Sequence, residues 1–84
     1  MAALTGKGVQ GMLPREYQET AEKLRKTFSD RQAWAIARML HELDLGAGEV
    51  TAAEILQNEG GFSEKQAKTL VRLYATLRKI ANAA

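Results

Sequence analysis

A repeated helix-start motif is the feature that most constrains how this chain can fold. Residues 28–43 match residues 62–77 at six of sixteen positions, and the identities are densest at the start of each copy. Ser29 and Ser63 each precede a glutamine by three residues. This is the spacing of a capping box, in which two side chains satisfy free backbone N–H groups at a helix start. The repeat therefore predicts two helices that begin in the same way.

Two further helices are indicated by apolar residues at helical spacing and by local start and stop signals. Pro14 fits the first turn of a helix, where its missing N–H has no cost. Thr51 and Glu54 have capping-box spacing at the start of a short helix, which ends at Gly60 and Gly61. The four predicted helices cover approximately 14–28, 29–45, 51–60 and 63–81.

The predicted fold class is all-α, a compact four-helix domain made of two helical hairpins. No stretch shows the sustained two-residue alternation of a strand, and short connections favour hairpins between neighbouring helices. Eighty-four residues suggest a single domain, here residues 12–84. Residues 1–11 contain three glycines and are predicted to form a flexible arm. The predicted core residues are Tyr17, Leu24, Phe28, Ile36, Leu40, Leu43, Ile55, Leu56, Phe62, Leu70, Tyr74 and Leu77.

The composition argues against catalysis and against metal or cofactor binding. The chain has no cysteine and a single histidine, His41, so the usual zinc sites cannot be built. Ser29 and Ser63 are expected to act as helix caps, and no second histidine offers an alternative base for a nucleophile. We therefore expect no enzyme activity, no metal and no cofactor.

The apolar segments are too short for a membrane span, which needs about eighteen residues or more. The first residues lack the apolar stretch of a secretory signal, so a cytoplasmic protein without a membrane partner is the default expectation. The formal net charge is only +2. The distribution of the basic residues is therefore more informative than their number.

Basic residues gather on one side of the last predicted helix. At about 100° per residue, four of them fall within an arc of roughly 60°. No acidic residue follows Glu64 in this helix. A cationic stripe of this kind suits a phosphate backbone, although it is also common on the solvated face of an amphipathic helix. The four residues are Lys65, Lys68, Arg72 and Lys79.

Residues 51–72 resemble a helix-turn-helix DNA-binding segment. The segment 53–56 followed by Gly60 looks like the positioning helix of that family, and residues from Ser63 onward look like the exposed start of a recognition helix. The resemblance implies that Ser63 and Arg72 contact phosphates. The residues that it implies would face bases are Lys65, Gln66, Lys68 and Thr69.

A second candidate surface surrounds the only tryptophan, Trp34. Arg31, Arg38 and His41 share its helix face, and an exposed tryptophan beside arginine is typical of a protein interface. The first helix or the N-terminal arm could instead cover Trp34 as part of the core.

The leading functional prediction is non-catalytic nucleic-acid binding, with duplex DNA the expected form. The last predicted helix would make the contacts, and Lys79 would assist. The alternative is a small protein-interaction module, an inhibitor or accessory subunit that binds a larger protein through Trp34 and Arg38. The sequence leaves the partner's identity and the oligomeric state open.

Overall fold

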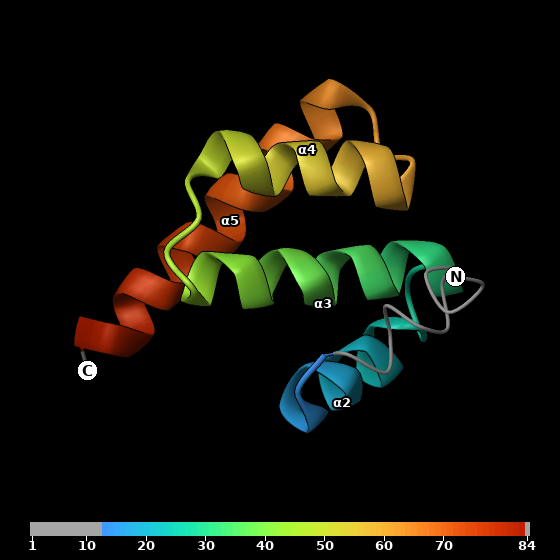
Figure 1. The fold of residues 1–84 in the computed structure, drawn as a ribbon, viewed down its shortest axis with the longest axis horizontal. Coiled ribbons are helices and arrows are strands. Elements are labelled where there is room, and N and C mark those ends of the chain that lie inside the picture. The colour runs from blue at the N-terminus through green and yellow to red at the C-terminus, as the bar shows by residue number, and fades with distance from the viewer. Residues whose placement is uncertain (1–12, 84) are drawn as a thin grey trace, which may run out of the picture.

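Four α-helices and their short connections make up the part of the chain that the structure describes. In this computed structural model the described residues are 13–83, with side chains described as far as Ala81. Helix α3 lies between α2 and α4, and α5 crosses both α3 and α4, with its last turns extending beyond the rest of the fold (Figure 1). The helices are α2 (Arg15–Leu24), α3 (Asp30–Asp44), α4 (Glu49–Gly60) and α5 (Glu64–Ala83).

The predicted all-α fold with four helices is confirmed, and no strand occurs among residues 13–83. The predicted arm, residues 1–11, lies outside the described residues. Each of the four helices buries residues against a neighbour, and such packing is how short helices gain most of their stability.

Both copies of the repeat begin with the predicted capping box. The backbone N–H of Gln32 donates to Ser29 Oγ at 3.2 Å, and the N–H of Ser29 donates back to the Gln32 side chain at 3.2 Å. Ser63 and Gln66 exchange the same two hydrogen bonds, at 3.1 and 3.2 Å. Each box satisfies two backbone donors that the helix itself leaves free.

The capping box predicted at Thr51 is wrong. Helix α4 begins two residues earlier, at Glu49, with Gly48 as its N-cap and no side-chain cap. Glu49 lies in the first turn, where a carboxylate interacts favourably with the positive end of the helix dipole. The end of α4 follows the prediction, since Gly61 adopts a left-handed conformation with φ of 71°. The N–H of Gly61 donates to the Gln57 carbonyl and the N–H of Phe62 donates to the Leu56 carbonyl, so two carbonyls in the last turns of α4 are satisfied.

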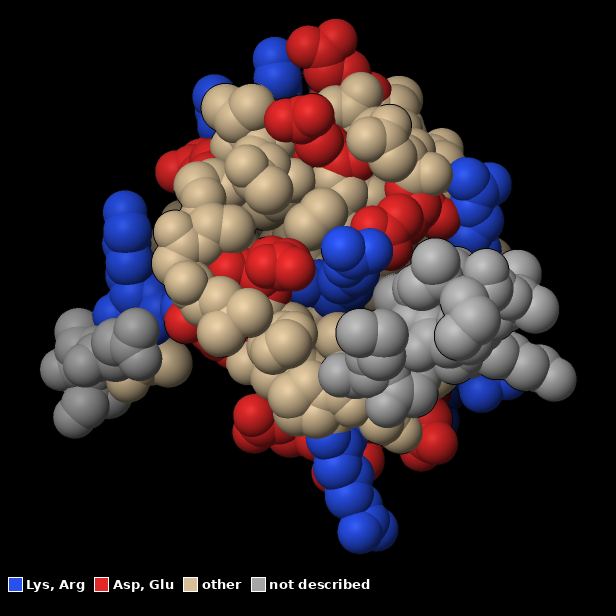
Figure 2. Space-filling view, viewed as in Figure 1, with Lys and Arg blue, Asp and Glu red and all other residues tan. Residues whose placement is uncertain are grey.

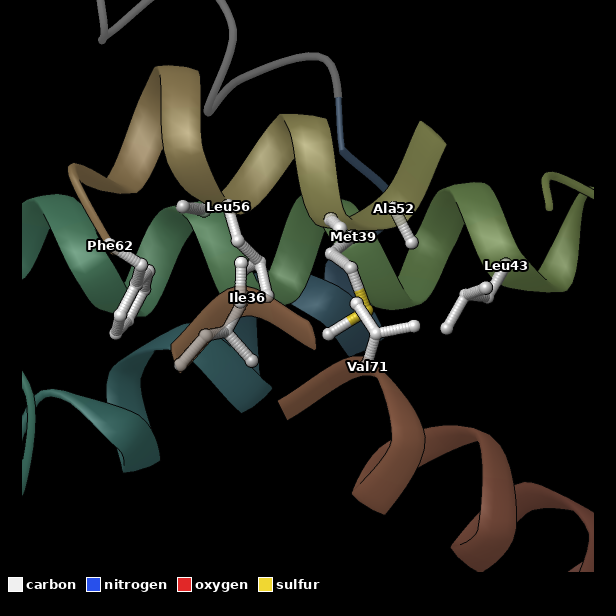
Figure 3. Packing of buried hydrophobic residues seen from close by; sticks show 10 residues of the cluster. Ile36, Met39, Leu43, Ala52, Leu56, Phe62 and Val71 are labelled. Atoms are coloured by element: carbon white, nitrogen blue, oxygen red, sulfur yellow. The ribbon is translucent and has the colours of Figure 1, made fainter. Parts of the chain in front are cut away.

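The core lies where α3, α4 and the first turns of α5 converge (Figure 3). Ile36 and Met39 come from α3, Leu56 from α4 and Val71 from α5, and all four are fully buried or nearly so. A second, smaller cluster joins α2 to the other side of α3. Its members are Leu13, Ala21 and Ala37, with Tyr17 and Trp34 packed against them.

Most of the predicted core residues lie in or against these clusters, and Leu77 does not. Its side chain is 49% exposed, because it lies on a different side of α5 from the buried residues Ala67 and Val71. The prediction also omitted Met39 and Val71, which are fully buried or nearly so. Ile36, Leu43, Leu56 and Phe62 are buried as predicted. The partly buried members are Tyr17, Leu24, Phe28, Leu40, Ile55, Leu70 and Tyr74.

Candidate nucleic-acid interface

The segment that resembles a helix-turn-helix consists of α4, a three-residue connection and α5. Gly60 fits closely at the end of α4, because a Cβ atom built there would lie 2.8 Å from the Phe62 ring and 2.9 Å from Ala35 Cβ. Gly61 supplies the left-handed turn, and the Ser63 cap then starts α5. The two glycines and the cap therefore determine how α5 leaves α4.

Helix α5 presents three different faces. At about 100° per residue, the buried residues Ala67 and Val71 define the side that packs against the core. The four basic residues of the predicted arc lie roughly 120° away in one direction. The exposed apolar residues Leu73, Leu77 and Ile80 lie roughly 120° away in the other direction. We call the second face the basic face of α5 and the third its apolar stripe.

The basic face is open to solvent, and one of its members is paired. Lys65, Lys68, Arg72 and Lys79 are all exposed. Lys68 Nζ lies 3.0 Å from Glu64 Oε1, one turn earlier on the same helix, and both side chains are largely exposed. Such a surface pair contributes only a few tenths of a kcal/mol, about 0.3–0.5. Among the described residues, no carboxylate lies within ion-pair distance of Lys65, Arg72 or Lys79.

Three polar residues assigned to DNA by the resemblance make local hydrogen bonds. Ser63 Oγ and the Gln66 side-chain oxygen form the capping box. Thr69 Oγ1 donates to the Lys65 carbonyl at 3.0 Å, within the helix. Gln66 and Thr69 also lie towards the apolar stripe, whereas Lys65 and Arg72 project from the basic face. The predicted base-contacting residues therefore fall into two groups on α5. Lys65 and Lys68 lie on the basic face, and Gln66 and Thr69 lie towards the apolar stripe.

Carboxylates border the basic face on the side of α4. A groove of about 400 Å³ between α4 and α5 is lined by Lys68 and Arg72 from one side and by Glu49, Glu54 and Glu64. Helix α4 itself carries three glutamates and no lysine or arginine. The face of the molecule seen in Figure 2 mixes both charges, and no broad patch of one sign is visible on it. A phosphate group would therefore approach α5 most favourably from the side away from α4.

The alternative surface around Trp34 takes part in internal contacts. Arg31 Nε donates to the Glu59 carbonyl at 2.7 Å, at the C-terminal end of α4 where a cation interacts favourably with the dipole. Arg38 pairs with the Glu59 carboxylate. The His41 ring lies 4.8 Å from the Tyr17 ring, and Trp34 packs against the α2 cluster. These side chains join α3 to its two neighbours.

A feature that sequence reasoning missed lies beside the start of α5. Phe28, Phe62 and Leu70 form the apolar part of an open groove of about 340 Å³, and Lys65, Gln66 and Thr69 complete its lining. The two phenylalanine rings meet edge to face, with centroids 6.2 Å apart. Both phenylalanines open a copy of the repeat, and this equivalence was the signal that could have suggested their contact.

The described residues offer no group of three or more metal-ligating side chains. Within the same residues, no helix combines the length and the apolar character that crossing a membrane requires. Comparison of the chain with models of known protein families, with curated proteins and with solved structures finds no match.

Proposed function

We propose that this protein is a non-catalytic nucleic-acid-binding module that contacts duplex DNA through the basic face of α5. The observation that carries the proposal is the position of Lys65, Arg72 and Lys79. All three are exposed on one side of a 20-residue helix, and no described carboxylate pairs with them. Cations placed along a helix in this way can neutralise several phosphates and release their counterions.

The connection before α5 also supports the proposal. The cap at Ser63 and the turn at Gly61 hold the first turn of α5 at the surface, so Lys65 and Lys68 lie near an accessible helix start. Contacts to the DNA backbone require charge at the right spacing and carry no sequence information by themselves. Gln66 and Thr69 are hydrogen-bonded locally, so the proposed binding depends mainly on phosphates.

Charge reversal tests the proposal directly. In a fluorescence anisotropy titration with labelled duplex DNA at low salt, Lys65→Glu combined with Arg72→Glu should reduce affinity at least tenfold. The matched control combines Lys23→Glu with Lys26→Glu, two exposed residues near the end of α2. The control makes the same change in net charge on another surface, so it should lose much less affinity.

Equal losses in the two double variants would show that only net charge attracts the DNA, and the basic face would then have no special role. An absence of binding by the unmodified protein at low salt would reject the proposal altogether. In that case a protein partner becomes the more favoured function, because the same helix also exposes an apolar stripe.

A further inference from the structure

The apolar stripe of α5 is largely open to solvent. Leu73, Leu77 and Ile80 are 52%, 49% and 62% exposed, and they follow one another along one side of the helix. Together with the partly buried Leu70 they have the 3–4–3 spacing of a two-heptad coiled-coil seam. Large apolar side chains that gather in a line, rather than singly, mark an interaction surface.

The repeat shows what this stripe lacks. Leu73 and Leu77 occupy the same repeat positions as Met39 and Leu43. In α3 these positions are 0% and 6% exposed, because Met39 and Leu43 pack in the core between α3, α4 and α5. In α5 the equivalent positions lie on a side of the helix that does not face the core, roughly 120° from Ala67 and Val71. The same pair of apolar positions is thus buried in the first repeat, in α3, and exposed in the second repeat, in α5.

We propose that the stripe binds the same stripe of a second copy of this chain, with the two α5 helices antiparallel. The residues that flank the stripe are uncharged: Thr69 and Thr76 on one side, Tyr74 and Ala81 on the other. A partner of strongly acidic or basic chemistry would find no complementary charges beside the seam. In a pair of identical helices these uncharged residues would face each other beside the seam, so no like charges meet at that position.

The groove at the start of α5 favours the antiparallel direction. The groove is continuous with the stripe, because its lining includes Leu70, which comes one turn before Leu73 on the same side of α5. If Leu73 lies opposite the second copy's Leu77, then Leu70 lies opposite its Ile80. The most exposed stripe residue of each copy would then enter the apolar groove of the other copy. In a parallel pair the stripe residues would meet their own equivalents, and both grooves would stay unfilled.

An antiparallel pair has a consequence that rests on the proposed function. The two-fold axis would run perpendicular to both helices, so a face to one side of the seam stays on the same side in both copies. The two basic faces would therefore lie next to each other on a single surface, and the two cores on the opposite side. The dimer would present twice the number of phosphate-binding cations in one direction.

Sedimentation equilibrium of the full chain tests the self-association. Because the seam is only two heptads long, we expect a reversible dimer of about micromolar or weaker affinity. Leu77→Gln should raise its dissociation constant at least tenfold, because it removes two apolar contacts from each dimer. Leu45→Gln is the matched control, since Leu45 is 69% exposed outside the stripe, and it should leave the constant unchanged.

Disulfide trapping tests the direction, and the absence of native cysteine keeps the background clean. In an antiparallel pair, position 70 of one copy lies beside position 80 of the other, whereas like positions are about 15 Å apart along the axis. A disulfide requires Cα atoms within about 7 Å. An oxidised mixture of Leu70→Cys and Ile80→Cys proteins should therefore give the mixed disulfide and almost no disulfide between identical chains.

Three results would each overturn the proposal. The first is a monomer at all concentrations up to about millimolar, and the second is a dimer that Leu77→Gln does not weaken. The third is a preference for disulfides between identical chains, which indicates a parallel pair. Both experiments are carried out without DNA, so their failure leaves the DNA-binding proposal to its own charge-reversal test. Conversely, a dimer that binds no DNA would support the self-association and reject the DNA-binding proposal.

Discussion

Asp44, the last residue of α3, makes contacts with two other helices. Its carboxylate accepts a hydrogen bond from the Tyr17 hydroxyl of α2, and its other oxygen lies 2.7 Å from Arg78 Nη2 of α5. These partners are 27 and 34 residues away in the sequence. The Asp44 side chain thus connects α2 to α5, two helices that have few direct contacts with each other.

Replacement of Asp44 should therefore destabilise the fold more than an ordinary surface substitution does. For Asp44→Ala we expect the free energy of unfolding to fall by about 1–2 kcal/mol, since the contacts are partly exposed. Asp44→Asn can still accept the tyrosine hydrogen bond and should lose less. Urea denaturation measures both values. Glu22→Ala, an exposed carboxylate without a described ion pair, is the control and should stay within about 0.5 kcal/mol of wild type.

The same contact makes stability depend on pH in the alkaline range. Burial, followed by the hydrogen bond to the Asp44 carboxylate, raises the pKa of Tyr17 from 10.0 to about 12. The folded state therefore favours the neutral phenol. This contribution to stability is complete below about pH 10, and it disappears as the pH rises through about 12.

Comparison with Tyr17→Phe isolates this effect from the titration of lysines. The difference in free energy of unfolding between the two proteins should shrink as the pH rises from about 9 to about 12. Both proteins should carry Tyr74→Phe, because burial also raises the pKa of Tyr74. A difference that stays constant over this range would show that Tyr17 titrates normally in the folded protein.

At the scale of the element, the junction between α4 and α5 depends on the small size of residue 60. Gly60→Ala would place a methyl group 2.8 Å from the Phe62 ring and 2.9 Å from Ala35. We expect this to reduce the free energy of unfolding by about 1–3 kcal/mol, as overpacked cores do. Gly48→Ala is the control, because a Cβ atom there meets nothing within 4 Å. Equal denaturation midpoints for the two variants would contradict the close packing.

Local signals in the sequence predicted those helix boundaries that side chains determine. The capping boxes at Ser29 and Ser63 and the stop at Gly61 are read from neighbouring residues, and all three are present. Thr51 had the right spacing for a cap but lies inside α4. The spacing of a capping box does not show which residue becomes the N-cap, because the start of α4 also depends on how the helix packs against α3.

Contacts between distant residues could not be predicted in this way. Periodicity placed Leu77 on an apolar face, but it does not show which part of that face the neighbouring helices cover. Likewise, Arg31 and Arg38 appeared to be surface residues, and only the folded chain brings them to the end of α4. The basic residues of α5 are different, since a helix alone determines that they share one face.

At the scale of the whole molecule, the adjacent helices α4 and α5 carry opposite net charges. Helix α4 carries Glu49, Glu54 and Glu59, whereas α5 has no acidic residue after Glu64. The carboxylates beside the groove should oppose a phosphate that approaches Lys68 or Arg72. The protein as isolated would therefore bind DNA less strongly than its basic face alone would allow.

Removal of one of these carboxylates should strengthen the proposed binding. Glu64→Gln releases Lys68 from its ion pair and removes a negative charge from the basic face. We expect DNA affinity at low salt to rise by about two- to fivefold, and to rise less at higher salt where screening is stronger. Glu22→Gln on α2 provides the matched control. A decrease in affinity, or an equal increase in the control, would argue against contact at this face.

The most direct test of the central claim is the salt dependence of duplex DNA binding. If the four cations of the basic face each neutralise a phosphate, the slope of log K against log salt concentration should be about −3 to −4 per protomer. The Lys65→Glu, Arg72→Glu variant should show a much shallower slope, and the Lys23→Glu, Lys26→Glu control should retain the steep one. A steep slope that survives loss of Lys65 and Arg72 would contradict the claim, because the phosphates would then be bound elsewhere.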